Sequence, residues 1–128
     1  MNKVITPATV PEPLSKFAHG IEIPPGARQV FVSGQVGVDR HGKLGEDIEA
    51  QIRNAFENVE AVLEAAGMGL ADVVRLNTYL TDADDVGTFR AIRDELLDGI
   101  LTASTLVMVS ALVHPAMKVE IECVAAKA

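Results

Sequence analysis

The sequence predicts a single α+β domain in which two helices cover one face of a mixed β-sheet. Three features support this prediction: the length of the chain, the order of its strand-like and helix-like segments, and one apolar strand near the C-terminus. At 128 residues, the chain has the size of one ordinary domain. No repeat or long linker divides residues 1–128. The predicted element order is ββαβαββ.

The first 33 residues predict an extended arm followed by a β-hairpin. Pro7, Pro11 and Pro13 oppose a helix and favour extended structure in the arm. The segments Ala18 to Ile23 and Arg28 to Ser33 are short and rich in β-branched residues, as strands are. A Pro-Pro-Gly turn lies between them, so we expect the two segments to pair as a hairpin.

Two segments have the spacing of amphipathic helices. From Asp47 to Ala66, apolar residues recur with i, i+3, i+4, i+7 spacing, and Gly67 stands where a helix would end. A second helix follows Asp82, Asp84 and Asp85, which we interpret as an acidic N-cap cluster. The apolar side of this helix consists of Val86, Phe89, Ile92 and Leu96.

The remaining strands predict association with another subunit. They are Val73 to Leu80, Thr105 to Val113 and Lys118 to Ala126. The second is apolar at nearly every position, which is typical of a strand buried on both faces, whereas two helices cover only one face of a sheet. No segment remains to form a third layer, so we expect a homo-oligomer. The alternative is a monomer with a modest apolar patch.

Composition narrows the choice of partners and compartment. The net charge of -7 opposes the binding of nucleic acid, which usually needs a basic surface. Cys123 is the only cysteine, which excludes an intrachain disulfide and fits a reducing compartment. No apolar stretch reaches the length of a signal peptide or a membrane span. We therefore expect a cytoplasmic protein with no membrane partner.

Local motifs taken singly predict little chemistry. His19, His41 and His114 show no metal-ligand spacing, so no metal is assigned. The segment Ser33-Gly34-Gln35-Val36-Gly37 matches neither a phosphate-binding loop nor a nucleophile elbow, and alone it predicts only a turn.

Two carboxylates in the last strand point to one face of the sheet. Glu120 and Glu122 are two residues apart and alternate with the apolar residues Val119, Ile121 and Cys123. If the apolar set packs under the helices, both glutamates project toward the face on which we expect a subunit contact. Each is either a candidate base or a member of a structural ion pair.

Several short motifs are spread across nearly the whole chain. They are Phe31-Val-Ser-Gly-Gln35, Gln51 and Asn58, Val62-Leu-Glu-Ala-Ala-Gly67, Asp72-Val-Val-Arg-Leu76, Ala103-Ser-Thr105 and Val119-Glu-Ile-Glu122. Together, in order and spacing, they resemble the reactive-intermediate deaminase family, also called YjgF/Rid or endoribonuclease L-PSP. The resemblance implies a chorismate-mutase-like fold and a homotrimer with a central barrel. It also implies that a small-molecule ligand binds in clefts between the subunits.

The resemblance further implies an activity and a set of site residues. Characterised deaminases of the family hydrolyse imines or enamines released by pyridoxal-phosphate enzymes to 2-oxo acids and ammonia, without a metal or cofactor. By this resemblance Glu120 positions or activates water, and Ser33 and Gly34 contribute to the pocket. Phe17 stands in place of a tyrosine of the pocket wall and lacks its hydroxyl, and Leu106 follows the arginine motif.

The chain departs from the family at the arginine that grips the substrate carboxylate. The family's Pro-Ala-Arg-Ser motif reads Thr102-Ala103-Ser104-Thr105, so the hydroxyl of Ser104 replaces a guanidinium suited to bidentate binding. Such a charged hydrogen bond is worth roughly 1.5 to 3 kcal/mol. We therefore expect weak deamination of small 2-imino acids and a less anionic substrate. Arg90 stands where the family often has an asparagine; it is either a solvated helix arginine or a source of positive charge for the pocket.

Three functions remain open at this point, and none requires a cofactor. The first is a hydrolase of an imine, an enamine or a related reactive intermediate, with Glu120 handling water and Ser104 and Ser33 offering hydrogen bonds. The second is a non-catalytic trimer that binds a small ligand in the same clefts. The third is the ribonuclease activity in the family's older name, which the acidic charge opposes.

Overall fold

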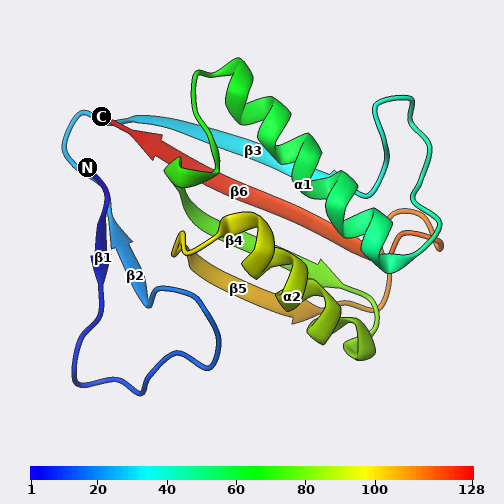
Figure 1. Ribbon diagram of the computed structural model, residues 1–128, viewed down its shortest axis with the longest axis horizontal. Coiled ribbons are helices and arrows are strands. Elements are labelled where there is room, and N and C mark those ends of the chain that lie inside the picture. The colour runs from blue at the N-terminus through cyan, green and yellow to red at the C-terminus, as the bar shows by residue number, and fades with distance from the viewer.

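The computed structural model describes residues 1–128 and confirms a mixed sheet with two helices on one face (Figure 1). The main sheet has four strands in the order β3 (Arg28–Val36), β6 (Val119–Lys127), β4 (Val73–Leu80) and β5 (Ala103–Met108). β6 is antiparallel to both of its neighbours, whereas β4 and β5 are parallel. The last strand of the chain therefore lies inside the sheet, between β3 and β4.

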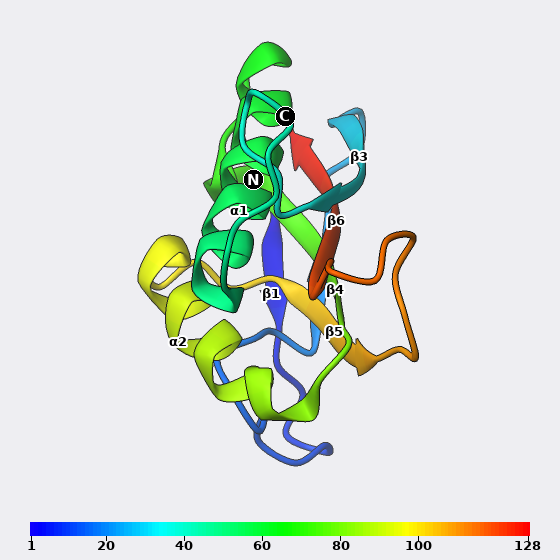
Figure 2. The ribbon, with the colours of Figure 1, turned by 90° about the vertical axis from the view of Figure 1, so that its right-hand side faces the viewer.

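Both helices, α1 (Ile48–Ala65) and α2 (Val86–Leu97), lie on the same side of this sheet (Figure 2). Asp47 caps α1 by accepting a hydrogen bond from the N–H of Ala50 at 2.8 Å, as N-cap aspartates do. Gly67 has a φ of 74°, a left-handed conformation that ends the helix at low cost. The helix predicted from periodicity is confirmed to within one residue at each end. Neither helix combines the length and the apolar character needed to cross a membrane.

The acidic cluster before α2 is confirmed by position, but its capping hydrogen bond serves a short 3₁₀ helix that precedes α2. Asp82 accepts a hydrogen bond from the N–H of Asp84 at 2.9 Å at the start of η2 (Ala83–Asp85), which runs directly into α2. Asp85 occupies the N-cap position of α2, and its side chain caps no backbone N–H. The other 3₁₀ helix, η1 (Leu70–Asp72), connects α1 to β4.

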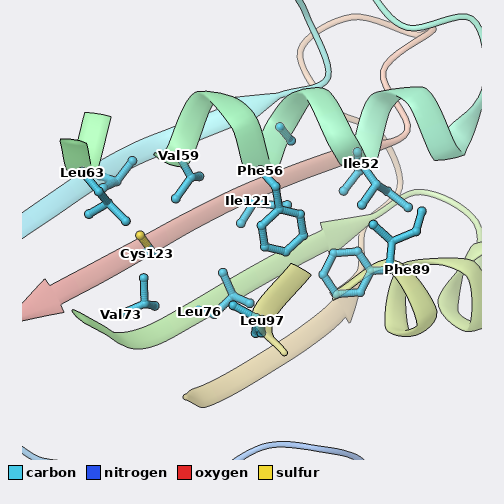
Figure 3. Packing of buried hydrophobic residues seen from close by; sticks show 14 of the residues in the cluster. Ile52, Phe56, Val59, Leu63, Val73, Leu76, Phe89, Leu97, Ile121 and Cys123 are labelled. Carbon is cyan, nitrogen blue, oxygen red and sulfur yellow. The ribbon is translucent and has the colours of Figure 1, made fainter. Parts of the chain in front are cut away.

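The core lies between the helices and the sheet, where apolar side chains from both layers interdigitate (Figure 3). Phe56 of α1 and Phe89 of α2 stack with their ring centroids 6.0 Å apart and join the two helices. Cys123 of β6 is buried in this layer, and desolvation raises the pKa of its thiol to about 11. The thiol is therefore protonated at neutral pH and packs as a small apolar group.

The predicted hairpin between the segment before the Pro-Pro-Gly turn and β3 is wrong. That segment forms β2 (Gly20–Glu22), which pairs with β1 (Lys3–Ile5) of the N-terminal arm in a separate two-stranded sheet. Just before β2, Ala18 bridges to Ala103 of β5, and its N–H donates to the carbonyl of Thr102 at 2.9 Å. β3 lies at the opposite edge of the main sheet from β5 and pairs with β6 alone, whereas β2 pairs with β1.

The predicted apolar strand from Thr105 to Val113 is shorter and more exposed than expected. β5 starts at Ala103 and ends at Met108, and the following residues form a loop that leads to β6. β5 is an edge strand, and Val107 and Met108 each keep 41% of their surface exposed. A strand buried on both faces is therefore not present within one chain.

The sheet face opposite the helices is uncovered and more polar than the sequence suggested. Alternation along β6 and β4 places glutamates and other polar side chains on this face, because their neighbours are buried under the helices. Phe31 of β3 is 73% exposed. The residues of β4 and β6 on this face are Arg75, Asn77, Tyr79, Glu120, Glu122 and Val124.

A buried amide connects the first turn of α1 to the loop before β6. Gln51 is only 2% exposed, and its Nε2 donates to the carbonyls of Gly45 and Ala116, each at 3.1 Å. Its Oε1 accepts from the N–H of Lys118 at 2.8 Å. Farther along α1, Asn58 donates to carbonyls at the end of β3. These amides fix the ends of the two strands that carry Ser33, Gly34 and Glu120.

Replacing Gln51 with leucine should destabilise the protein by about 3 kcal/mol, because three hydrogen bonds to backbone groups are lost, each worth roughly 1 kcal/mol. Urea unfolding followed by circular dichroism measures this change. Asn54→Ala is the matched control: Asn54 makes one side-chain bond, to the carbonyl of Gly37 at 3.1 Å, so its loss should cost about 1 kcal/mol. Equal losses in the two variants would contradict the role assigned to Gln51.

Candidate functional site

The residues singled out from the sequence fall into two separate groups in the structure. Phe17, Arg90, Ser104 and Leu106 line one pocket of about 270 Å³. We call it the β5 pocket; its full lining is Ser15, Phe17, Arg90, Arg93, Ser104, Thr105 and Leu106. Ser33, Gly34 and Glu120 lie elsewhere, where β3 meets β6.

The β5 pocket is built from three segments that are distant in sequence. β5 contributes Ser104 and Leu106, and α2 contributes its two arginines. The arm contributes Phe17, which is fixed by the backbone bridge of Ala18 to β5. The ring of Phe17 also packs edge-on against that of His19, with centroids 5.9 Å apart. The arm is therefore docked on β5, and it forms one wall of the pocket.

Two guanidinium groups give this pocket a positive charge. Arg93 is 3% exposed, and both its Nε and its Nη2 donate to Oδ1 of Asp94, at 3.1 and 2.9 Å. Arg90 is exposed and takes part in none of the ion pairs of the chain. No carboxylate lines the pocket. Sequence reasoning found Arg90 but missed Arg93, although three-residue spacing on a helix places both on one side.

The second group centres on an irregularity in the pairing of β3 with β6. The register shifts between Val32 and Gln35, so Ser33 and Gly34 lie outside the regular ladder, as in a β-bulge. A Cβ on Gly34 would overlap the carboxylate of Glu120. Glycine is thus required for this carboxylate to rest against the backbone of β3. Glu120 accepts none of the side-chain hydrogen bonds of the chain and joins none of its ion pairs.

The neighbouring Glu122 is held by its own partners. Its Oε1 accepts a hydrogen bond from the hydroxyl of Tyr79 at 2.5 Å and another from Nδ2 of Asn77 at 3.3 Å. The bond to this carboxylate, together with desolvation, raises the pKa of the Tyr79 phenol. The two glutamates therefore differ: Glu122 is engaged within the chain, whereas the carboxylate of Glu120 is available to an outside partner.

The two groups cannot meet within one chain. Ser104 pairs with Leu76 of β4, and Leu76 is buried under the helices, so Ser104 points to the helix side. Glu120 points to the opposite face. It lies on β6, and β4 separates β6 from β5. Two strand spacings alone amount to roughly 10 Å. No cluster of three or more His, Cys, Asp or Glu side chains suited to a metal ion forms in either place.

Comparisons with known proteins give consistent matches along almost the whole chain. The family model described as "Endoribonuclease L-PSP" matches residues 8–127. A 2-iminobutanoate/2-iminopropanoate deaminase of Salmonella typhimurium is 30% identical over 99% of both chains. A RutC family protein of Pyrococcus horikoshii is 33% identical, again over 99% of both. The crystal structure of a Rid family protein of unknown function from Yersinia pestis superposes with a TM-score of 0.87 at 32% identity, over 97% of each chain.

Replacing Gly34 with alanine should move the Glu120 side chain to another rotamer, because the new Cβ would overlap its carboxylate. The melting temperature should change by no more than a few degrees, since the glutamate is flexible and has no partner to lose. A crystal structure of the variant measures the displacement. Gly69→Ala is the control, because a Cβ there meets nothing within 4 Å. An unmoved Glu120 in Gly34→Ala would refute the proposed close approach.

Proposed function

Because the chain belongs to the endoribonuclease L-PSP family, we propose that it is a homotrimeric hydrolase of an imine, an enamine or a related reactive intermediate. The reaction takes place in clefts between subunits and uses neither a metal nor a cofactor. Deaminases of this kind are among its relatives, including the 2-iminobutanoate/2-iminopropanoate deaminase of Salmonella typhimurium.

The observation that carries this proposal is the division of the site into two incomplete halves. The β5 pocket has walls and hydrogen-bond donors but no general base. The Gly34–Glu120 pair has an unengaged carboxylate but belongs to the other face of the sheet. A second subunit docked on the uncovered face and the β5 edge brings the carboxylate of one chain to the pocket of the next. Exposed Phe31, Val107 and Met108 supply apolar surface for that contact.

The chemistry assigned to the cleft is the addition of water to a C=N bond. Glu120 takes a proton from water as the oxygen bonds to the imine carbon, and the proton passes to nitrogen. Glu120 then carries the hydroxyl proton of the resulting carbinolamine to nitrogen, the C–N bond breaks, ammonia leaves and a C=O bond forms. One water is consumed, and no electrons are exchanged with an outside group. Donors of Ser104 and of the backbone around Ser33 and Gly34 hold the substrate during these steps.

Glu120→Gln should lower the rate of ammonia release by at least about 100-fold, because an amide cannot accept the proton of the attacking water. The assay uses 2-iminopropanoate and 2-iminobutanoate generated freshly in the cuvette, together with an uncharged imine of similar size. Glu46→Gln is the matched control, since Glu46 is an exposed loop carboxylate outside both halves of the site. It should retain full activity.

Three other results would contradict the assignment of a hydrolase that depends on Glu120. Turnover that is unchanged in Glu120→Gln would refute the role of this residue. Ligand binding without any turnover, in the wild type and the variant alike, would favour a non-catalytic binding protein. Cleavage of RNA by rigorously purified protein would favour the ribonuclease of the family's name, although the net charge of -7 opposes the approach of a polyanion.

A further inference from the structure

Arg93 is a buried cation whose hydrogen-bonding capacity is only partly used within the chain. A guanidinium has five N–H donors in a fixed plane. Two of the nitrogens, Nε and Nη2, share a single oxygen of Asp94, and Nη1 donates to no group of the chain. A charged group that is 97% removed from water is costly unless its donors are satisfied. The unused edge belongs to a residue that lines the β5 pocket, where an incoming group can meet it.

The charges around Arg93 favour the binding of an anion in the β5 pocket. Arg90 lies one helical turn earlier and lines the same pocket without an ion-pair partner. Two like charges at this spacing repel each other, and an anion between them relieves the repulsion. Asp94 neutralises only Arg93, and Arg90 keeps its charge without a partner. The result is a locally positive pocket on a protein whose net charge is -7.

The rest of the lining limits the size and character of the anion. The pocket measures about 270 Å³, which suits a ligand of few atoms. Phe17 and Leu106 offer apolar surface, and the hydroxyls of Ser15 and Ser104 offer hydrogen bonds. Thr105 is already engaged, since its Oγ1 accepts from Nη2 of Arg75 at 2.8 Å. A small carboxylate with a short alkyl chain matches this combination of two cations, neutral donors and apolar walls.

We propose that Arg93, supported by Arg90, binds the carboxylate of a small 2-imino or 2-oxo acid in the β5 pocket. The inference rests on the proposed hydrolase function and assigns the residue that holds the substrate carboxylate in place of the family's arginine. Ser104 leaves β5 without a guanidinium, and the cation is supplied from α2 instead. The sequence analysis expected a less anionic substrate because of Ser104. With Arg93 in the pocket, we expect an anionic substrate instead.

The test is a titration of ¹⁵N-labelled protein with 2-oxobutanoate and with its neutral analogue 2-oxobutanamide, followed by NMR. The wild type should bind the carboxylate at least tenfold more tightly than the amide. Arg93→Gln should weaken carboxylate binding by about tenfold or more and leave amide binding unchanged, because a charged hydrogen bond of this kind is worth about 1.5 to 3 kcal/mol. Arg40→Gln is the control for net charge, since Arg40 is an exposed loop arginine outside the pocket.

Further variants protect the test against a folding defect in Arg93→Gln. Arg93→Lys keeps the charge but loses the planar fork, so it should bind the carboxylate more weakly while retaining the wild-type spectrum. Adding Ser104→Arg to Arg93→Gln should restore carboxylate binding from the opposite wall of the pocket. Equal affinity of the wild type for the two probes would overturn the proposal. So would full carboxylate binding in folded Arg93→Gln or Arg93→Lys.

This inference and the proposed function fail in different ways. Carboxylate binding that depends on Arg93, without any release of ammonia from imines, would sustain the anion site and refute the hydrolase. Turnover that depends on Glu120, with no preference for charged over uncharged imines, would sustain the hydrolase and refute the anion site. A weaker trimer in Arg93→Gln, with carboxylate affinity unchanged, would show that Arg93 pairs with a neighbouring subunit and would also overturn the proposal.

Discussion

The register of β6 is the constraint on which the rest of the structure depends. Val119, Ile121, Cys123 and Ala125 on this strand are buried against the helices, and Glu120, Glu122 and Val124, which alternate with them, face the open side of the sheet. Because side chains alternate along a strand, a slip of one residue would bury two glutamates and expose the core. The same register that completes the core therefore places Glu120 on the open side. Gln51 holds the beginning of this strand, and pairing with both β3 and β4 holds its length.

This constraint also explains why the candidate site is divided. Glu120 is directed away from the helices, whereas Ser104 is directed toward them, and no rotamer change brings the two side chains together. Tyr79 and Asn77 satisfy Glu122 within the chain, so its charge is stabilised before any subunit approaches. Glu120 has no such partner, and Gly34 gives it space. A carboxylate without a partner on an uncovered face suits a group that acts on a ligand or a neighbouring chain.

Much of the fold could be predicted from local pattern, because the helices and the inner strands bury one regular face. The spacing of Ile52, Phe56, Val59 and Leu63 predicted α1 correctly, and these side chains form the core. The pairing of β2 with β1 could not be predicted, since it depends on Ala18 joining the far edge of the sheet. The extent of the apolar run after Ser104 was also predicted wrongly, because β5 lies at the edge of the sheet and ends at Met108.

The site was predictable only in part, and for a physical reason. Phe17, Ser104, Leu106 and Arg90, which were singled out from the sequence, line one pocket, whereas Ser33, Gly34 and Glu120 lie elsewhere. Arg93 was not found, because an arginine beside an aspartate on a helix has the sequence pattern of a solvated pair. Its burial results from the docking of β5 and the arm against α2, which no local pattern reports. A positive charge that comes from Arg93 of α2, and not from the Ser104 position of β5, can be recognised only in the tertiary structure.

The most direct test of a cleft shared between subunits is complementation between two inactive chains. One carries Glu120→Gln, and the other carries Ser104→Trp, which fills the β5 pocket. Each alone should be inactive. Co-expressed chains that assemble at random should regain about one quarter of wild-type turnover, because one cleft in four combines an intact carboxylate with an intact pocket from the neighbouring chain in a cyclic assembly. No recovered activity in verified mixed oligomers would contradict the shared cleft.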